Sequence, residues 1–369
     1  MLVQAPELGL SLSSRGPVLK EEGNRFFVGS DLAVEDKEWV EFWQKMIAPE
    51  KVQISLPDSN KKIIVISGPT SVGKTELSFL IAQAVGGEIV SADSMQVYRG
   101  MDIGTAKASL EERSRTPHHL IDIRDVDETF NVMDFWKEAT EAIEGIFQRG
   151  HVPIVVGGTG FYLNALLYGP PGGPPSVEIV RLHWEAELEK NGPLALFEKL
   201  KEVDPDYAKT ITWNDKHKIV RALEIISLTS KRVSQISRQS VDVHKYNARC
   251  WFLHKPRDLL YEGIDKRCEE MVSRGFVDEV RALDLAGLRS NSSASQAIGY
   301  RQCLEFLSSS QSQLDMDRFM VLFKQASRRY AKRQFTWFRK EPLFRWLSRG
   351  EVSFDRAAEI ILQDFELSF

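Results

Sequence analysis

The sequence contains few cysteines. Three occur in 369 residues, Cys250, Cys268 and Cys303, and no two of them form a Cys-x-x-Cys pair. An odd number of distant cysteines argues against a disulfide framework, and the missing pairs argue against a cysteine-based zinc site. We expect three reduced thiols inside a cell.

Long apolar runs are absent as well. No run reaches the length of about 18 residues that a transmembrane helix requires, so we expect none. The first residues lack the charged start and continuous apolar core of a secretory signal. They carry several serines, one acid and two basic residues, Arg15 and Lys20, which leaves a weak organelle signal open. We expect the cytoplasm, with a plastid or mitochondrion as the alternative.

The chain also lacks a surplus of positive charge. Its net charge is −4 and its pI about 6.1, so any interaction with RNA must depend on local clusters of basic residues. A hydrophobic content of 43% provides for a large core. One large or two medium domains are expected, and no internal repeat is apparent.

Short β-branched runs alternate with helical patterns in the first half of the chain. Such alternation predicts a parallel sheet covered by helices on both faces. The expected strands are residues 61–67, 88–92, 119–123 and 153–156, and the expected helices are residues 74–84 and 134–147.

Changes in composition divide the chain into four parts. Residues 1–60 form an N-terminal extension with an amphipathic helix candidate at 36–46, and residues 61–168 form an α/β core. A Pro/Gly-rich hinge then opens a helical insertion at 169–247. Residues 248–369 complete the core with a last strand at 250–253, followed by helices. We therefore predict an α/β, P-loop NTPase-like parallel sheet flanked by helices, with a small inserted helical subdomain and a helical C-terminal part.

A phosphate-binding motif follows the first predicted strand and opens the first predicted helix. It fits the pattern G-x-x-x-x-G-K-[ST] in the structural context that this pattern requires. The glycines let successive backbone N–H groups face one anion, and the helix N-terminus favours negative charge. The lysine supplies a cation, and the final hydroxyl suits Mg²⁺. The predicted diphosphate-binding residues are Gly68, Pro69, Thr70, Ser71, Val72, Gly73, Lys74 and Thr75.

This motif does not identify the ligand. A nucleotide-hydrolysing enzyme or a kinase would also need an acidic residue at the end of a neighbouring strand to hold magnesium. Asp93 and Asp122 are both placed to do so.

A basic ridge lies near the C-terminal end. Thirteen residues, 328–340, hold six basic side chains and no acid. They are interleaved with aromatic residues, a combination that suits a single-stranded RNA loop, although aromatics in a helix more often belong to the core. The six basic residues are Arg328, Arg329, Lys332, Arg333, Arg339 and Lys340.

The segment after the second strand identifies a family. Residues 93–107 read DSMQVYRGMDIGTAK, which closely resembles the signature of the tRNA dimethylallyltransferases, also called tRNA isopentenyltransferases. The resemblance covers roughly residues 61–339. Further matching blocks are residues 118–122, 157–162, 214–215, 221–224, Arg267 with Met271, 297–302 and 331–339.

The resemblance implies a reaction. A dimethylallyl group passes from dimethylallyl diphosphate to N6 of adenosine 37, next to the tRNA anticodon, and diphosphate leaves; tRNA turnover would then feed cytokinin-type products. It implies Mg²⁺, bound at Thr75, and three catalytic residues, Asp93 as the base, Thr159 and Arg267. From the residues alone, Asp93 could instead hold magnesium or cap a helix, Thr159 could be an N-cap and Arg267 could lie on a solvated face.

The resemblance also implies contacts with a tRNA anticodon stem-loop, whose target base is flipped out toward Asp93. We expect a monomer. Gly263 stands where the family usually has a second arginine, and the cysteines of a C-terminal zinc finger found in some members are missing. The implied tRNA contacts are Asp93, Ser94, Met95, Gln96, His217, Lys218, Arg221, Gln296, Gly299, Tyr300, Arg301, Lys332, Arg333, Gln334, Thr336, Trp337 and Arg339.

Two alternatives stay open. An adenylate dimethylallyltransferase would act on free AMP, ADP or ATP, but it has no need for the basic block at residues 332–339. A P-loop NTPase or RNA-binding regulator without transfer activity would hydrolyse ATP or bind tRNA without modifying it.

Overall fold

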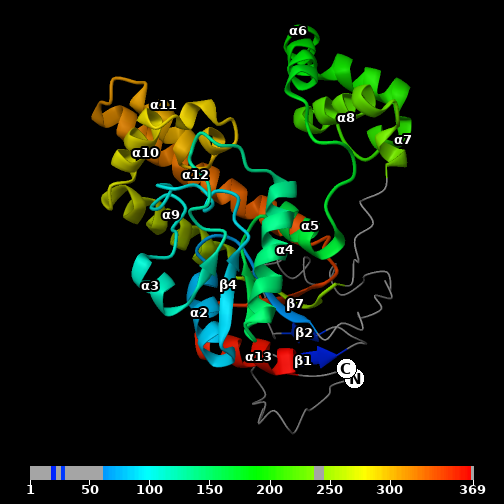
Figure 1. Ribbon diagram of the computed structural model, residues 1–369. Helices are drawn as coiled ribbons and strands as arrows, with labels where there is room; N and C mark the ends of the chain where they lie inside the picture. Colours follow the sequence, from blue (N-terminus) through cyan, green and yellow to red (C-terminus); the bar gives the residue numbers. More distant parts are fainter. Residues whose placement is uncertain (1–17, 22–25, 30–60, 237–244, 367–369) are drawn as a thin grey trace. The chain divides into compact units, whose positions relative to one another are not determined.

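The computed structural model describes residues 18–21, 26–29, 61–236 and 245–366 (Figure 1). The helix expected at residues 36–46 lies outside them. The chain divides into two compact units. Met1–Leu167 and His244–Phe369 form the first unit, and Tyr168–Val243 form the second. Among the described residues, no helix has both the length and the apolar character needed to cross a bilayer.

A six-stranded parallel sheet forms the centre of the first unit, which confirms the predicted fold class. Its strand order is β5-β4-β6-β3-β7-β8. Every neighbouring pair runs parallel, so the carboxyl ends of all six strands lie along one edge. The strands are β3 (Lys62–Ser67), β4 (Gly87–Ser91), β5 (His118–His119), β6 (Val152–Val156), β7 (Asn247–His254) and β8 (Phe344–Ser348).

The observed strands differ from the predicted ones in three places. The third expected strand, residues 119–123, is only the two-residue β5, because Leu120 and Asp122 adopt left-handed φ angles of 63° and 57° that turn the chain away. The strand β8 was missed, because Pro342 and Arg345 interrupt its apolar pattern. A two-stranded antiparallel sheet, β1 (Val18–Glu21) and β2 (Phe26–Gly29), was not predicted either.

Helices surround the sheet and form the C-terminal part, as predicted. The longest helix of the first unit is α12, and Ser312 is its N-cap. The Ser312 hydroxyl accepts from the Asp315 N–H, and the Asp315 carboxylate accepts from the Ser312 N–H. The helices are α2 (Lys74–Val85), α3 (Leu110–Arg115), α4 (Val132–Gln148), α5 (Gly160–Tyr168), α9 (Arg257–Ser273), α10 (Phe276–Leu285), α11 (Tyr300–Leu307), α12 (Gln313–Phe338) and α13 (Phe354–Glu366), with short 3₁₀ turns η3 (Leu288–Ser290) and η4 (Ala294–Gln296).

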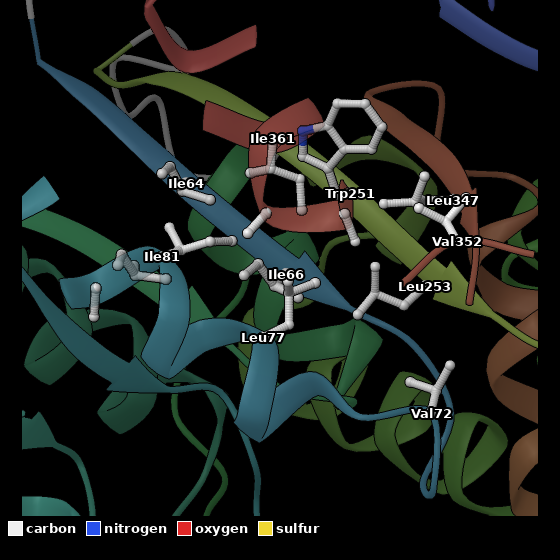
Figure 2. Packing of buried hydrophobic residues seen from close by; sticks show 14 of the residues in the cluster. Ile64, Ile66, Val72, Leu77, Ile81, Trp251, Leu253, Leu347, Val352 and Ile361 are labelled. Carbon is white, nitrogen blue, oxygen red and sulfur yellow. The ribbon is translucent and has the colours of Figure 1, made fainter. Parts of the chain in front are cut away.

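Buried apolar side chains hold β3 and β7 against α2 and α13 (Figure 2). Ile64 and Ile66 of β3 meet Leu77 and Ile81 of α2, and all four are completely buried. Burying such a side chain contributes about 1.5–3 kcal/mol. This packing fixes the end of β3 relative to the start of α2, which are the two ends of the phosphate-binding loop.

The second unit is helical in its described part. It contains α6 (Glu178–Val203), α7 (Pro205–Ala208), α8 (Lys216–Thr229) and the 3₁₀ turn η2 (Val233–Gln235). The helix α6 is broken at Gly192, where φ is 78°. A separate apolar cluster, which includes Trp184, Leu200 and Ile219, holds α6 against α8.

A glycine turn at residues 157–160 follows β6 and meets the end of β4. The Gly157 N–H donates to the Ile66 carbonyl, and the Ala92 N–H donates to the Val156 carbonyl. A Cβ atom at Gly157 would lie 2.1 Å from the Ala92 carbonyl oxygen. Only glycine therefore allows the ends of β4 and β6 to approach this closely.

We predict that Gly157→Ala lowers the free energy of unfolding by about 2–3 kcal/mol, the usual size of an overpacking effect. Urea denaturation would measure it. The matched control is Gly145→Ala in α4, where the new Cβ meets only the flexible end of Arg149 at 3.4 Å. The control should be neutral or slightly stabilising, because alanine favours helix over glycine by about 1 kcal/mol. Equal stability of the two variants would show that the turn at Gly157 is free to move.

Candidate functional site

A cavity of about 310 Å³ lies within the first unit beyond the carboxyl ends of the strands. Ligands of open parallel α/β sheets bind at this edge. Charged and polar groups line one part of the wall and apolar groups another. The polar lining includes Thr70, Asp93, Ser94, Thr105, Gln296, Arg267, Tyr330 and Arg333, and the apolar lining includes Ile264, Cys268, Met271 and Phe323.

The phosphate-binding loop has the backbone that its sequence predicts. Gly68, Ser71 and Gly73 all have positive φ angles, of 149°, 64° and 91°. A Cβ at Gly68 would lie 2.5 Å from the Leu253 carbonyl oxygen, and one at Gly73 would lie 2.6 Å from the Phe354 ring. Gly73 precedes the first residue of α2, so the helix N-terminus faces the loop.

Lys74 is the central cation of this loop. Its Nζ donates to the carbonyl oxygens of Gly68 and Pro69, at 2.8 Å each. Burial, and next the charge of Arg267, lower its pKa to about 7, while Asp93 acts in the opposite direction. Burial also lowers the pKa of Arg267, which the Asp93 carboxylate partly offsets. Lys74, Arg267 and Asp93 therefore lie close enough to interact, although they come from distant parts of the sequence.

Asp93 and Thr159 are positioned by the ends of β4 and β6. The Asp93 Oδ1 accepts from the Met95 N–H at 2.9 Å, which fixes its carboxylate at the turn after β4. The Thr159 hydroxyl accepts from the Ser94 N–H at 3.1 Å, and the Thr159 N–H donates to the Ala92 carbonyl. The structure thus brings together the three predicted catalytic residues, Asp93, Thr159 and Arg267.

Tyr330 belongs to the same group, although the sequence analysis counted it only among the aromatic residues of the basic ridge. Its hydroxyl forms a side-chain hydrogen bond with Thr159, and burial and the nearby Asp93 charge raise its pKa. Its position on α12, one turn before Arg333, is the only sequence signal that could have placed it in the cavity.

Asp122 does not fit the role of magnesium ligand that the sequence left open. Its carboxylate pairs with Lys107 and Arg113, both at 2.6 Å. Within the described residues, no cluster of three His, Cys, Asp or Glu side chains could hold a metal ion. Thr75 lies exposed on the first turn of α2, beside Lys74.

The departure at Gly263 lies beside the phosphate-binding loop. A Cβ there would be 3.6 Å from the Ser71 Cβ, so a longer side chain at this position would reach the loop. From the end of β7, the Lys255 Nζ donates to the Ser71 carbonyl at 3.2 Å. A cation therefore contacts this part of the loop from a different element.

Glu279 of α10 holds one wall of the cavity, and sequence reasoning missed it. Its carboxylate accepts from three successive N–H groups, those of Asp102, Ile103 and Gly104, and from the Tyr300 hydroxyl. Gly104 packs so tightly that a Cβ would lie 2.3 Å from Phe276. The following carbonyl, that of Thr105, accepts from the Gln96 amide at 3.3 Å. Glu279 thus fixes the loop that orients Gln96.

Besides Asp93 and Gln96, described above, the residues implied as tRNA contacts fall into four groups. Ser94, Met95, Gln296, Tyr300 and Arg333 line the cavity, and Arg301, Lys332, Thr336, Trp337 and Arg339 are exposed on α11 and α12. Gly299 and Gln334 are buried; the Gln334 amide donates to the Gly158 carbonyl, so it anchors α12. His217, Lys218 and Arg221 lie on α8 of the second unit, where Arg221 pairs with Glu224.

The basic ridge is partly neutralised. The Arg328 Nη1 donates to both carboxylate oxygens of Asp265, at 2.7 and 2.6 Å. Tyr330, Phe335 and Phe338 are turned into the protein, whereas Trp337 is 41% exposed. The exposed basic side chains are Arg329, Lys332, Arg333, Arg339 and Lys340.

Known proteins share this arrangement of sequence and fold. The family model of IPP transferase matches residues 96–341. A tRNA dimethylallyltransferase of Protochlamydia amoebophila (strain UWE25) is 58% identical over 86% of this chain and 93% of that protein. The tRNA dimethylallyltransferase of Chlamydia felis (strain Fe/C-56) is 48% identical over 83% of this chain and 90% of that protein.

Solved structures agree with these sequence relatives. The tRNA isopentenylpyrophosphate transferase of Bacillus halodurans is 40% identical, with a TM-score of 0.61, over 83% of this chain and 97% of that one. A eukaryotic dimethylallyltransferase acting on tRNA is 30% identical, with a TM-score of 0.65, over 80% of this chain and 75% of that one.

We predict that Glu279→Ala lowers the free energy of unfolding by about 3 kcal/mol, because it leaves several buried donors without an acceptor. Tyr300→Phe should cost about 1 kcal/mol by itself. The double variant should lose less than the sum, since Tyr300 and Glu279 share a hydrogen bond. Urea denaturation measures all three, and strictly additive losses would contradict the shared network.

Proposed function

Because the chain belongs to the IPP transferase family, we propose that it transfers a dimethylallyl group from dimethylallyl diphosphate to N6 of adenosine 37 in tRNA. The products are N6-dimethylallyladenosine in tRNA and free diphosphate. One observation carries the proposal: Lys74, Arg267 and Asp93 interact beside a single cavity with a partly apolar wall.

The cation side of the cavity suits the leaving group. The N–H groups of residues 68–75 present the same cradle to a diphosphate as to the phosphates of a nucleotide. Lys74 and Arg267 offset the negative charge that develops on the bridging oxygen as the allylic carbon–oxygen bond breaks. The apolar wall, which includes Ile264, Met271 and Phe323, suits the five-carbon chain.

The carboxylate side suits the acceptor. The adenine N6 lone pair is delocalised into the ring, so the amine is a weak nucleophile. As the carbon–nitrogen bond forms, Asp93 takes the proton that N6 loses. Thr159, held by the Ser94 N–H, is placed to donate a hydrogen bond to the bridging oxygen or to orient the amine.

Magnesium fits this site only together with the substrate. Thr75 supplies one hydroxyl ligand, and a Mg²⁺ ion commonly completes its shell with phosphate oxygens and water rather than with protein groups alone. The bound ion would neutralise diphosphate charge. Lys74 and Arg267 hold the same oxygens from the protein side.

The tRNA would be bound by the exposed part of the basic ridge, with its target base flipped into the cavity. Lys332, Arg333 and Arg339 would contact phosphates, which gives a salt-dependent affinity. The bacterial relatives favour the cytoplasm over a plastid or mitochondrion.

The alternative acceptors have less support. The relatives named above are tRNA enzymes, so they do not support a transferase that acts on free AMP, ADP or ATP. An inactive regulator would not need Asp93, Thr159 and Arg267 together at one cavity.

The decisive measurement is transfer of radiolabelled dimethylallyl from its diphosphate, with Mg²⁺, to unmodified tRNA and in parallel to AMP and ATP. We predict label on tRNA, and a fall in kcat of about a hundredfold to ten-thousandfold for Asp93→Ala, the usual contribution of a general base. Lys74→Ala should also remove most activity. Label on free nucleotides alone, or full activity of Asp93→Ala, would sink the proposal.

The lowered pKa of Lys74 predicts a pH dependence of diphosphate binding. A bound anion favours the charged amine, so binding takes up a proton above pH 7. Pyrophosphate affinity should be highest below pH 7 and fall by up to about tenfold per unit above it. In Lys74→Arg the guanidinium stays charged, so this component should disappear. The affinity of both proteins for pyrophosphate is measured by isothermal titration calorimetry at each pH. The protonation of pyrophosphate affects both proteins equally, so it cancels in the comparison. Parallel pH profiles of the two affinities would contradict the prediction.

A further inference from the structure

Two exposed aromatic side chains meet beside the cavity. Phe161, on the first turn of α5, and Trp337, near the end of α12, are 45% and 41% exposed. Their rings pack edge to face with centroids 6.4 Å apart. Aromatic residues of this size are normally buried, so an exposed pair marks a binding surface.

The pair is held in place by the contacts on either side of it. On one side, the Gln334 amide donates to the Gly158 carbonyl at 2.9 Å. On the other, the Asn164 amide donates to the Glu341 carboxylate at 3.0 Å. Between them Gly160 lets the indole approach, because a Cβ there would lie 2.4 Å from Trp337. The backbone is thus shaped to present this indole.

The pair also continues the site along α12. Tyr330, Arg333 and Trp337 follow one stripe of α12 at spacings of three and four residues, and Lys340 follows just beyond the end of the helix. Tyr330 contacts Thr159 and Arg333 lines the cavity, so Trp337 lies one turn, about 5.4 Å, farther out. A nucleotide that directly flanks a base in the cavity would therefore have Trp337 within reach.

The charge around the pair favours one class of partner. The neighbouring exposed residues include Arg333 of α12 and, just past the end of this helix, Arg339 and Lys340, and residues 328–340 contain no acid. Basic side chains together with an exposed aromatic face are the usual features of a site for single-stranded nucleic acid. An apolar protein partner would not need the cations.

We propose that Trp337 and Phe161 form a stacking platform for the base of a nucleotide directly flanking the target adenosine in tRNA. The proposal rests on the proposed function in that tRNA is the acceptor. The indole stacks on the base, Phe161 supports the indole edge, and the basic residues of α12 hold the adjoining phosphates. Stacking does not depend on base identity, so the platform adds affinity rather than sequence choice.

The test measures binding of an anticodon stem-loop RNA to the full chain by fluorescence anisotropy. Trp337→Leu should weaken the Kd by about tenfold, within the range known for loss of one stacked base. Trp337→Phe should retain most of the affinity, and Phe161→Ala should lose about threefold. The control is Leu314→Ala, an apolar residue on the first turn of α12 that is even more exposed, at 78%, and it should bind like the wild type.

A double-mutant cycle completes the test, with RNAs that carry an abasic nucleotide at position 36 or 38. One of these RNAs should bind the wild type about tenfold more weakly than intact RNA does. The same abasic RNA and intact RNA should bind Trp337→Leu equally well. Additive losses for both RNAs would overturn the platform. Unchanged RNA affinity of Trp337→Leu would also overturn the platform, and the exposed pair would then be a surface for a protein partner. If Trp337→Leu does not fold, Phe161→Ala with both abasic RNAs takes its place, and its threefold loss should disappear with the abasic RNA that lacks the stacked base.

Donor binding and transfer separate this proposal from the proposed function. The pyrophosphate Kd and the KM for dimethylallyl diphosphate should be unchanged in Trp337→Leu, while the KM for tRNA rises. If the wild type transfers no label to tRNA, the proposed function fails. If transfer is normal but the cycle is additive, only the platform fails.

Discussion

The site depends on a turn whose residues, apart from Thr159, are all glycines. Residues 157–160 join β6 to α5, and three of these four residues are glycines in contact with other elements. Gly157 contacts the Ala92 carbonyl, Gly158 contacts Gln334, and Gly160 contacts Trp337. The ends of β4 and α12 therefore both approach the backbone of this turn. Its one side chain, Thr159, is left to contact Ser94 and Tyr330. A methyl group at Gly157 would force the backbone at Ala92 and Gly157 apart, and one at Gly158 or Gly160 would displace Gln334 or Trp337 of α12.

The electrostatics of the cavity follow from this close packing. Lys74 and Arg267 are two half-buried cations, and the loss of solvation lowers the pKa of each. Asp93 offsets only one charge. An anion with at least two charges would restore the balance, and a diphosphate is such an anion. When it leaves, Lys74 can again become neutral near pH 7. In the proposed reaction, the same group would stabilise the departing diphosphate without holding it permanently.

Local patterns predicted those parts of the fold that local sequence determines. The loop at residues 68–75 and the strands β3, β4 and β6 are set by short apolar runs and glycines. β8 was missed because it is stable only through its pairing with β7, and its sequence carries Arg345 for an ion pair with Asp364. β5 ended early because Leu120 and Asp122 turn, and no apolar pattern reveals a positive φ.

The candidate site divides in the same way. Asp93, Thr159 and Arg267 were found by resemblance, since nothing local distinguishes Arg267 from a solvated arginine. Glu279 was not found, because the N–H groups that it accepts from lie about 175 positions earlier in the chain. Residues of one sequence motif also differ in burial and therefore in role. Within residues 332–339, Gln334 anchors the helix, while Arg333 and Trp337 face outward.

An acidic protein can bind RNA because its charge is arranged by helix face. Arg328 is paired with Asp265 and therefore adds little to the positive field of α12. The next turns present Lys332, Arg333 and Arg339 with no acid among residues 328–340. Beyond a Debye length of about 8 Å, the acids elsewhere on the protein are largely screened at physiological salt. The RNA therefore meets a locally positive surface whatever the net charge. On such a surface phosphate contacts supply the general affinity, and the position of the target base depends on the uncharged groups between them.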